Sequence, residues 1–495
     1  MAELQSTNRV KLSKVRESTF GVTPTSPVFK EVRQTSSGLA ANPNTVISNE
    51  IRSDRQVTDL ILTGITSGGP IGGELSFKSV DDDLEEALQG TWATKPTRDN
   101  NGTADSVITA VAASSDTYTV VTGAAFLPNH IILAEGFGQS ANNGVFIAQA
   151  STNATAVIAP SSPGLVDEAV PPGAAVLRAV GYQGASGDIV ATVTGGNALT
   201  STSLDFTTLS LNVGEWIKIG GVAINTFFAT TAANNDWARI SAISANRLSF
   251  DIVPTGWAAD AGTSKTIQLY FGDFLINGTT KRSSTFERQY LDHSPVTYEY
   301  LTGQILDTLA IEAPAQAIVT LNKSYIGANG TSTTTRASGA SDVAAPTKFV
   351  MNSSSNVGRI GFDGSAITGA NYVMRAAINY GNNLRRQTAV GSVAAVGVGN
   401  GEFNVTGTLE SYFSDASVLT KILNNTLTSF DLRVGRSDGN REKLVFDFPS
   451  IKLSAGAPTV PGKNQDVMLP ATFQAIRDAT KGYTASVTRI WYLPN

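Results

Sequence analysis

The residues in this sequence that are best suited to catalysis or metal binding are few and far apart. The 495-residue chain has two histidines, His130 and His293, and neither has a second His or a Glu one helical turn away. It has no cysteine, which excludes disulfide bonds, thiolate zinc sites and cysteine nucleophiles. We therefore expect no Ser-His-Asp triad, no metal site and no cofactor.

One acidic run would suit a divalent cation, because hard cations prefer oxygen ligands. It consists of Asp81, Asp82, Asp83, Glu85 and Glu86. The same charges also suit the first turn of a helix, and Leu84 and Leu88 follow at i and i+4 spacing before Gly90. A helix start explains the run without a metal, and we predict a helix here.

The remaining motifs do not define an active site. The Gly-rich segments 67–75 and 396–403 lack the Gly-Lys-Ser/Thr ending of a phosphate-binding loop. No basic patch is interleaved with aromatic residues, as a sequence-specific nucleic-acid surface would require. A glycan hydrolase would need paired carboxylates in a cleft, which the sequence does not define. We expect no enzymatic activity.

Composition and periodicity indicate a mainly β protein with one or two short helices. Charged residues are only 16% of the chain, and Gly numbers 46, which is unlike helical arrays or charged disordered chains. Apolar residues alternate with polar ones in 402–413, and they do so on both sides of Asp438-Gly439 in 429–448, which predicts a strand and a hairpin. We also expect a closing hairpin over 473–493, turned near Lys481-Gly482, and a second helix within 414–426.

Charge divides the chain into an acidic middle and a balanced remainder. Residues 104–272 contain 5 Lys+Arg and 11 Asp+Glu, a net charge of −6, whereas the whole chain has 36 and 41. A polar linker-like stretch, 95–106, precedes this segment, and the turn signal Asn277-Gly278 follows it. We expect an inserted acidic β-rich domain over 103–272, between a divided domain formed by 1–102 and 273–495.

The acidic segment contains a weak internal duplication. Segments 126–160 and 211–254 each have an apolar run, an Asn-Asn pair (Asn142-Asn143 and Asn234-Asn235), a strand and a final Pro160 or Pro254. Two small β-sandwich-like modules are the simplest explanation. The alternative is that any two β segments interrupted by Gly and Asn look somewhat alike.

The N-terminal 21 residues lack the apolar core of a secretory signal, and no apolar run approaches the roughly 20 residues that span a bilayer. We expect a chain made in the cytoplasm as a soluble product. A secreted or surface-exposed β-rich adhesin is the alternative interpretation, and the missing signal argues against it.

Several segments, in order, resemble the major tail proteins of siphophages, the tail tube subunits of long flexible-tailed bacteriophages. The resemblance is carried by KVRESTFGVTPTSPVFKEVRQTSSGL (14–39), TVISNEIRSDRQVTDL (45–60), 276–292, NYGNNLRRQTAVG (379–391), FNVTGTLESYF (403–413) and GKNQDVMLPATFQA (462–475). It implies β-sheets with a flanking helix, and six copies that close into a ring whose inner strands form a continuous barrel. Stacked rings would form the tube of the virion tail.

The resemblance also implies the partners and the region of contact. The partners would be other copies of the chain, the tail terminator, tape measure and tail-tip proteins, and viral DNA that passes through the lumen without sequence-specific binding. An N-terminal arm and extended loops bridge rings in such tubes, and charges alternate in 50–55, where we expect an extended segment. The predicted subunit-interface residues are Arg16, Glu17, Glu50, Arg52, Asp54 and Arg55.

A lumen that conducts DNA should be neutral or negative, because each phosphate paired with a fixed cation adds salt-dependent binding free energy. We expect the insertion to project outward from such a tube.

Overall fold

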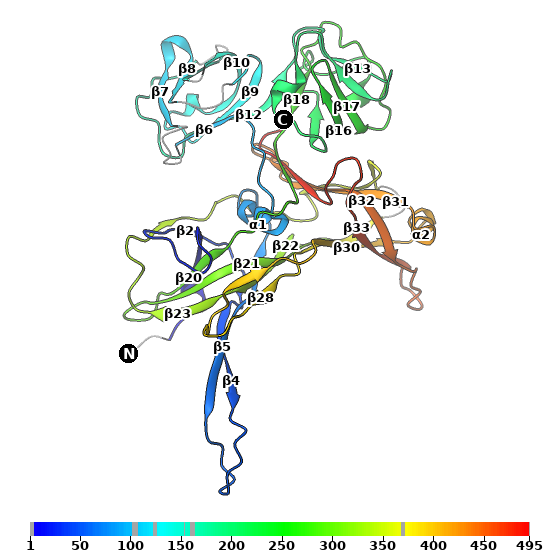
Figure 1. Ribbon diagram of the computed structural model, residues 1–495. Helices are drawn as coiled ribbons and strands as arrows, with labels where there is room; N and C mark the ends of the chain where they lie inside the picture. Colours follow the sequence, from blue (N-terminus) through cyan, green and yellow to red (C-terminus); the bar gives the residue numbers. More distant parts are fainter. Residues whose placement is uncertain are drawn as a thin grey trace.

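The computed structural model describes residues 4–100, 107–121, 126–152, 154–158, 164–367 and 372–494. This part of the chain is mainly β, as predicted, with a 19-stranded and a 13-stranded set of paired strands and two short α-helices (Figure 1). Neither α-helix in it is long and apolar enough to cross a membrane. Residues 101–106 of the predicted linker and Pro160 of the first repeat lie outside the described residues.

The 19-stranded set contains two units, each with six strands and one α-helix. In the first unit the pairing order is β1 (Val10–Arg16), β20 (Ser284–Tyr290), β21 (Thr297–Pro314), β22 (Thr320–Gly327), β5 (Leu60–Glu74) and β4 (Ala40–Ile47). Its helix is α1 (Asp81–Leu88), which lies against β21. The predicted helix at the acidic run is therefore confirmed.

In the second unit the pairing order is β25 (Val357–Phe362), β31 (Leu427–Gly435), β32 (Lys443–Ala455), β33 (Met468–Ala475), β30 (Asn404–Tyr412) and β27 (Val373–Gly381). Its helix is α2 (Ser417–Leu423), so the second predicted helix is confirmed. The predicted hairpin is also confirmed, since β31 and β32 pair with Phe430 opposite Phe448. The predicted strand in 402–413 is β30.

The two units share one continuous antiparallel sheet. The C-terminal half of β21 pairs with β27, from Thr308 opposite Gly381 to Pro314 opposite Arg375. The resulting order is β4, β5, β22, β21, β27, β30, β33 and β32. We call these eight strands the inner sheet.

The predicted closing hairpin in 473–493 is wrong. The strands β33 and β34 (Ser486–Ile490) both pair with β32, at residues 451–455 and 443–447 respectively, and within the described residues they do not pair with each other. The 13-residue β32 is long enough to offer one edge to both strands. The turn near Lys481-Gly482 therefore connects two strands that follow one another along a third.

The remaining strands of this part extend the edges of the two units. They are β2 (Val28–Glu31), β3 (Ser36–Ser37), β19 (Asp273–Ile276), β23 (Asn329–Thr333), β24 (Ser341–Val343) and β26 (Ser365–Ala366), with a separate pair, β28 (Arg385–Gln387) and β29 (Gly397–Gly399).

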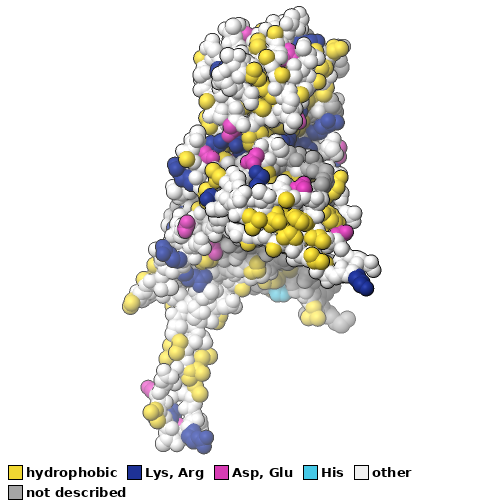
Figure 2. Space-filling model, turned by 90° about the vertical axis from the view of Figure 1, so that its right-hand side faces the viewer, with side chains coloured by type: hydrophobic (Ala, Val, Ile, Leu, Met, Phe, Trp, Pro, Cys, Tyr) yellow, Lys and Arg dark blue, Asp and Glu magenta, His cyan; other side chains and the backbone are white. Residues whose placement is uncertain are grey.

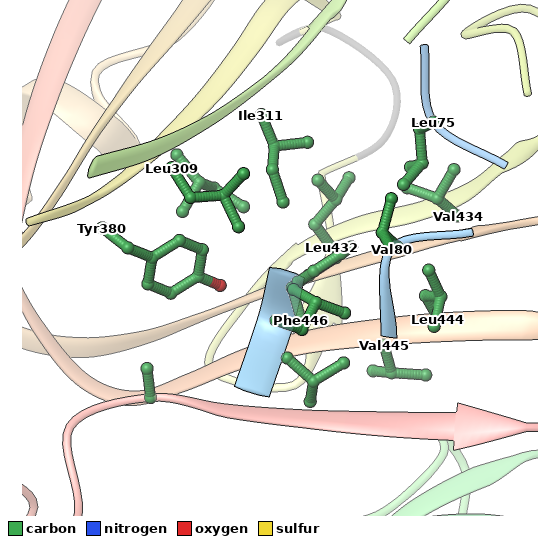
Figure 3. Close-up of a cluster of buried hydrophobic side chains, with 14 of the residues drawn as sticks. Leu75, Val80, Leu309, Ile311, Tyr380, Leu432, Val434, Leu444, Val445 and Phe446 are labelled. Carbon is green, nitrogen blue, oxygen red and sulfur yellow. The ribbon is translucent and has the colours of Figure 1, made fainter. Parts of the chain in front are cut away.

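One face of the inner sheet is buried against the other strands of the two units and against the first part of β32, which precedes its pairing with β33. Leu309, Ile311 and Tyr380 come from this face, and they point into the same space as Leu432 and Phe446 of β31 and β32 (Figure 3). All five side chains are at most 1% exposed. The opposite face of the inner sheet is consequently the one free to face something other than the protein core.

Residues 97–270 form the 13-stranded set, which has two halves with the same strand order. The first half runs β7, β8, β11, β10, β9, β12 and the second runs β13, β14, β17, β16, β15, β18, with β12 paired to β18 and β6 added beside β12. The bounds are β6 (Thr97–Asp99), β7 (Ile108–Ala112), β8 (Thr117–Val120), β9 (His130–Glu135), β10 (Gly144–Ser151), β11 (Thr155–Ile158), β12 (Val176–Gln183), β13 (Val190–Thr192), β14 (Ala198–Thr200), β15 (Trp216–Ile219), β16 (Trp237–Ser244), β17 (Arg247–Ile252) and β18 (Gln268–Tyr270).

The two Asn-Asn pairs make the same hydrogen bonds in the two halves. Asn142 exchanges side-chain hydrogen bonds with the backbone of Val166, and Asn234 does so with Ala258. Asn143 and Asn235 likewise each bind the N–H and the carbonyl of one loop residue, Phe137 and Phe228. Equal topology and equal buried polar contacts make the two halves structural counterparts.

Buried ion pairs fix the 97–270 region to the rest of the chain. Lys95 Nζ lies 2.8 Å from Glu215 Oε2, and both side chains are at most 1% exposed. Arg239 Nη1 lies 3.0 Å from Asp447 Oδ1 of β32, again in a buried contact. Separating the two parts would break both pairs. Arg239 would keep Asp251, but Lys95, Glu215 and Asp447 would lose these buried ionic partners, so we expect a rigid connection.

His130 gives this region a specific pH dependence. Its ring is buried between Tyr182 and Phe271, Nδ1 accepts the N–H of Leu127, and burial lowers its pKa to about 4. Because the unfolded histidine titrates near 6.5, the unfolded state takes up the proton first as the pH falls. The stability present above pH 6.5 is therefore lost between about pH 6.5 and 4, at about 1.4 kcal/mol per pH unit and about 3 kcal/mol in total.

We predict that His130→Leu flattens this loss, measured as the unfolding midpoint of the 97–270 region between pH 7 and 4. His293→Leu, at an exposed position, is the matched control. An unchanged pH profile in His130→Leu would contradict the assignment.

Candidate lumen face and assembly surfaces

The face of the inner sheet that points away from the core carries mainly short, uncharged side chains. Strand register places these residues in rows that cross the sheet, because directly opposed residues point to the same face. One row is Asn322, Ala310, Asn379, Thr406, Gln474 and Lys452, and the next is Thr320, Glu312, Ala377, Thr408 and Thr472. We call this surface the open face.

The charges in these rows and at their margins nearly cancel. The acids are Glu74, Glu312 and Glu410, and the bases are Arg375 and Lys452. Arg375 Nε lies 2.6 Å from Glu312 Oε1, and this hydrogen bond raises the pKa of the guanidinium, with a smaller contribution from Glu410. The arginine is thus held by carboxylates on its own surface, and the open face offers mainly hydroxyl, amide and methyl groups.

A hairpin arm formed by β4 and β5 extends from the inner sheet (Figure 1). At its base, Gly68 and Gly69 have φ values of +137° and +135°, which side chains rarely adopt, and a Cβ there would lie 2.3 Å from a backbone oxygen. Because these two residues have no side chain, β5 can lie between β4 and β22 at the point where the arm leaves the sheet.

The arm exposes many apolar side chains, which are visible along its length in Figure 2. They are Val46, Ile47, Ile51, Val57, Leu60, Ile61 and Leu62, each at least 48% exposed. An apolar surface on a thin projecting element indicates contact with another molecule.

Four of the six predicted interface residues lie together at the tip of this arm. Glu50, Arg52, Asp54 and Arg55 are all exposed, and Arg52 Nη2 lies 2.7 Å from Asp54 Oδ2. The expectation of an extended segment here is wrong. The chain turns at residues 53–54, and Arg55 has a φ of +59°, because the tip must reverse the chain between β4 and β5.

The other two predicted residues bind within their own chain. Arg16 Nη2 lies 3.1 Å from Glu85 Oε2 and remains partly exposed. Glu17 is buried, and its carboxylate accepts hydrogen bonds from Gly21 N–H, Thr285 Oγ1 and Gly303 N–H. The structure therefore brings together the tip residues, and places Arg16 and Glu17 at the far end of β1.

The acidic run is a set of ion pairs rather than a metal site. Asp83 binds Lys14 and Lys323 at 2.7 and 2.9 Å, and Glu86 binds Lys14 at 3.1 Å. Asp81, Asp82 and Glu85 are paired with Arg489, Lys30 and Arg16. No group of three potential metal-ligating His, Asp or Glu residues occurs in the described ranges.

Sequence reasoning missed the open face, although its alternation was visible in β30. Asn404, Thr406 and Thr408 alternate there with the buried Val405 and with Gly407. The sequence alone did not show that seven other strands align their polar positions with these.

A β protein with an open, nearly neutral sheet face and a projecting apolar arm has the features of an assembling structural subunit. Residues 7–475 match the family model described as phage tail tube protein, and the chain belongs to this family. It is thus a structural protein of the viral tail. A search of curated proteins finds no match.

Proposed function

We propose that this chain is the tail tube subunit of a siphophage, and that closed rings of this chain stack into a tube that conducts DNA during ejection. The observation that carries the proposal is the open face. It spans the whole inner sheet, and its charges nearly cancel. Its role is structural, with no enzymatic step and no cofactor.

A lumen lined by the open face would let DNA slide. Phosphates bind fixed lysines and arginines by displacing counterions, and each such contact adds affinity that must be broken for the DNA to move. On the open face the exposed arginine is already paired with Glu312. Hydroxyl and amide groups exchange hydrogen bonds between DNA and water at a small net cost in free energy. They therefore do not form strong binding sites that would hold the DNA in place.

The arm provides the axial contact in this proposal. Its apolar side chains would pack on a neighbouring ring, and the charged tip residues Glu50, Arg52, Asp54 and Arg55 would set the register of that contact. Terminator, tape measure and tail-tip proteins would meet the same surfaces at the ends of the tube.

We further propose that 103–272 is an inserted domain that projects outward from a tube domain formed by 1–102 and 273–495. The 97–270 region has two hydrophobic cores of its own, although some of its side chains, including Trp216 and Trp237, pack into the main core. The region lies at the opposite end of the molecule from the arm (Figure 1). Its net charge of −6 over 104–272 suits a solvated outer surface.

Cysteine labelling tests the proposal, because the natural chain has no cysteine. Asn379→Cys places a thiol on the open face, and Val170→Cys places one on the 97–270 region, where Val170 is 86% exposed. In assembled tubes, seen by negative-stain electron microscopy, a maleimide on a large polymer should label Cys at 170 only. In unassembled chains it should label both. Failure to form rings or tubes, or equal labelling of both thiols in tubes, would contradict the proposal.

A further inference from the structure

The two units of the 19-stranded set have the same pairing path. The first runs β1, β20, β21, β22, β5, β4, and the second runs β25, β31, β32, β33, β30, β27. The order along the chain is also the same, with α1 directly after β5 and α2 directly after β30. The chain thus contains one arrangement twice, and β4 is the counterpart of β27.

The long strands repeat the same detail. β21 pairs with β20 through residues 297–304 and with β22 through 305–312. β32 pairs with β31 through 443–452 and with β33 through 451–455. β21 and β32 therefore each join the outer strands of their unit to the inner sheet. This makes β32 the counterpart of β21.

The junction between the units shows how such units join. The edge of β21, residues 308–314, pairs with the edge of β27, residues 375–381. The segment that corresponds to this edge of β21 begins at residue 455, the end of β32. The segment that corresponds to the edge of β27 consists of β3 and the start of β4. Counting residues along the paired strands of each unit shows that residues 34–42 of the first unit correspond to residues 373–381 of the second.

Each counterpart segment has a partner on one side only within the described residues. β3 and β4 pair with β5 alone, and residues 455–461 pair with β33 alone, at Ala455–Thr472 and Thr459–Met468. A groove of about 900 Å³ runs beside residues 31–37, and the side-chain oxygen Oε1 of Gln34 is buried there with no hydrogen-bond partner. A strand edge beside an unfilled groove can accept another strand.

We propose that residues 455–461 of one copy pair with residues 34–42 of the next copy, as β21 pairs with β27, and that three chains rather than six close each ring. The expectation of six copies assumes one unit per chain, whereas each chain supplies two. This inference rests on the proposed function, since the wall of the lumen is incomplete until a second copy adds its strand.

The helices support the same junction. The end of α1 contacts the second unit, where Asn382 Nδ2 donates to the carbonyl of Ala87 and Gln89 exchanges hydrogen bonds with Asn400. At the end of α2, by contrast, Leu423 is 76% exposed, and Leu427 at the start of β31 is 55% exposed. α2 lies on the right-hand side in Figure 1, and Figure 2, which views the molecule from that side, shows a group of apolar side chains there. By the correspondence between the units, α2 would meet the base of the arm of the next copy, which exposes Leu62.

Native mass spectrometry of rings formed by the full chain tests the number of chains. We expect three copies of the 51.8 kDa chain per ring. Six copies per ring would overturn this inference and leave the proposed function standing, whereas a chain that forms no ring at all would contradict both.

A substitution tests the junction itself. Leu423→Glu puts a charge into the proposed contact, and we expect at least a tenfold higher concentration for half-maximal assembly. Ile224→Glu is the matched control, because Ile224 is 78% exposed on the 97–270 region. An unchanged far-UV circular dichroism spectrum checks the fold of each variant. Equal assembly of the two variants would show that α2 does not lie at the junction.

Discussion

Asp83→Asn should destabilise the chain by about 3–5 kcal/mol, because it removes the partner of two buried lysines. Asp83 is 4% exposed, and its two carboxylate oxygens bind Lys14 of β1 and Lys323 of β22. Lys14 keeps Glu86, but among the described residues Asp83 is the only carboxylate in an ion pair with Lys323. The loss should appear as a lower midpoint of urea unfolding and as faster hydrogen exchange in α1 and β22.

The neighbouring residue Asp82 provides the control. It binds Lys30, and these side chains are 37% and 61% exposed. Solvent screens such a pair, so Asp82→Asn should cost at most about 1 kcal/mol. Equal losses in the two variants would mean that the buried pairs do not hold α1 against the inner sheet.

Thr408→Lys should convert tubes that release DNA into tubes that retain it. Thr408 lies on the open face between Ala377 and Thr472, whose short side chains leave room for a lysine. Every ring would repeat the new cation. A duplex that contacts about six of these lysines should lose about a thousandfold in affinity between 50 and 200 mM salt. Retention of a short fluorescent DNA duplex by purified tubes, measured at the two salt concentrations, gives the result.

Two variants separate charge in the lumen from other effects. Thr408→Gln adds length without charge, and Val170→Lys adds the same charge on the 97–270 region. Neither should retain DNA. If Val170→Lys tubes hold as much DNA as Thr408→Lys tubes, the retained DNA lies on the outside, and the open face does not line the lumen.

Local signals in the sequence predicted the elements that local physics determines. The acidic residues before Leu84 and Leu88 predicted α1, since charge at a helix start and i, i+4 spacing act within one turn. Asp438-Gly439 predicted the β31–β32 hairpin, because the turn itself sets the pairing.

Features set by distant pairing were not predictable in the same way. The strands β33 and β34 looked like a hairpin, but each found a partner in β32. Glu17 was predicted as a subunit-interface residue, and the sequence did not show that the fold places Thr285 and Gly303 of its own chain against it. The repeat of the two units was hidden because 97–270 separates α1 from β20, whereas α2 is followed directly by β31.

Electron cryo-microscopy of assembled tubes tests the central claim most directly. The account predicts a lumen wall made of inner sheets, with Thr406, Thr408 and Asn379 facing the axis and the 97–270 regions on the outside. A reconstruction with the open face buried in a contact, or turned to the outer surface of the tube, would contradict it.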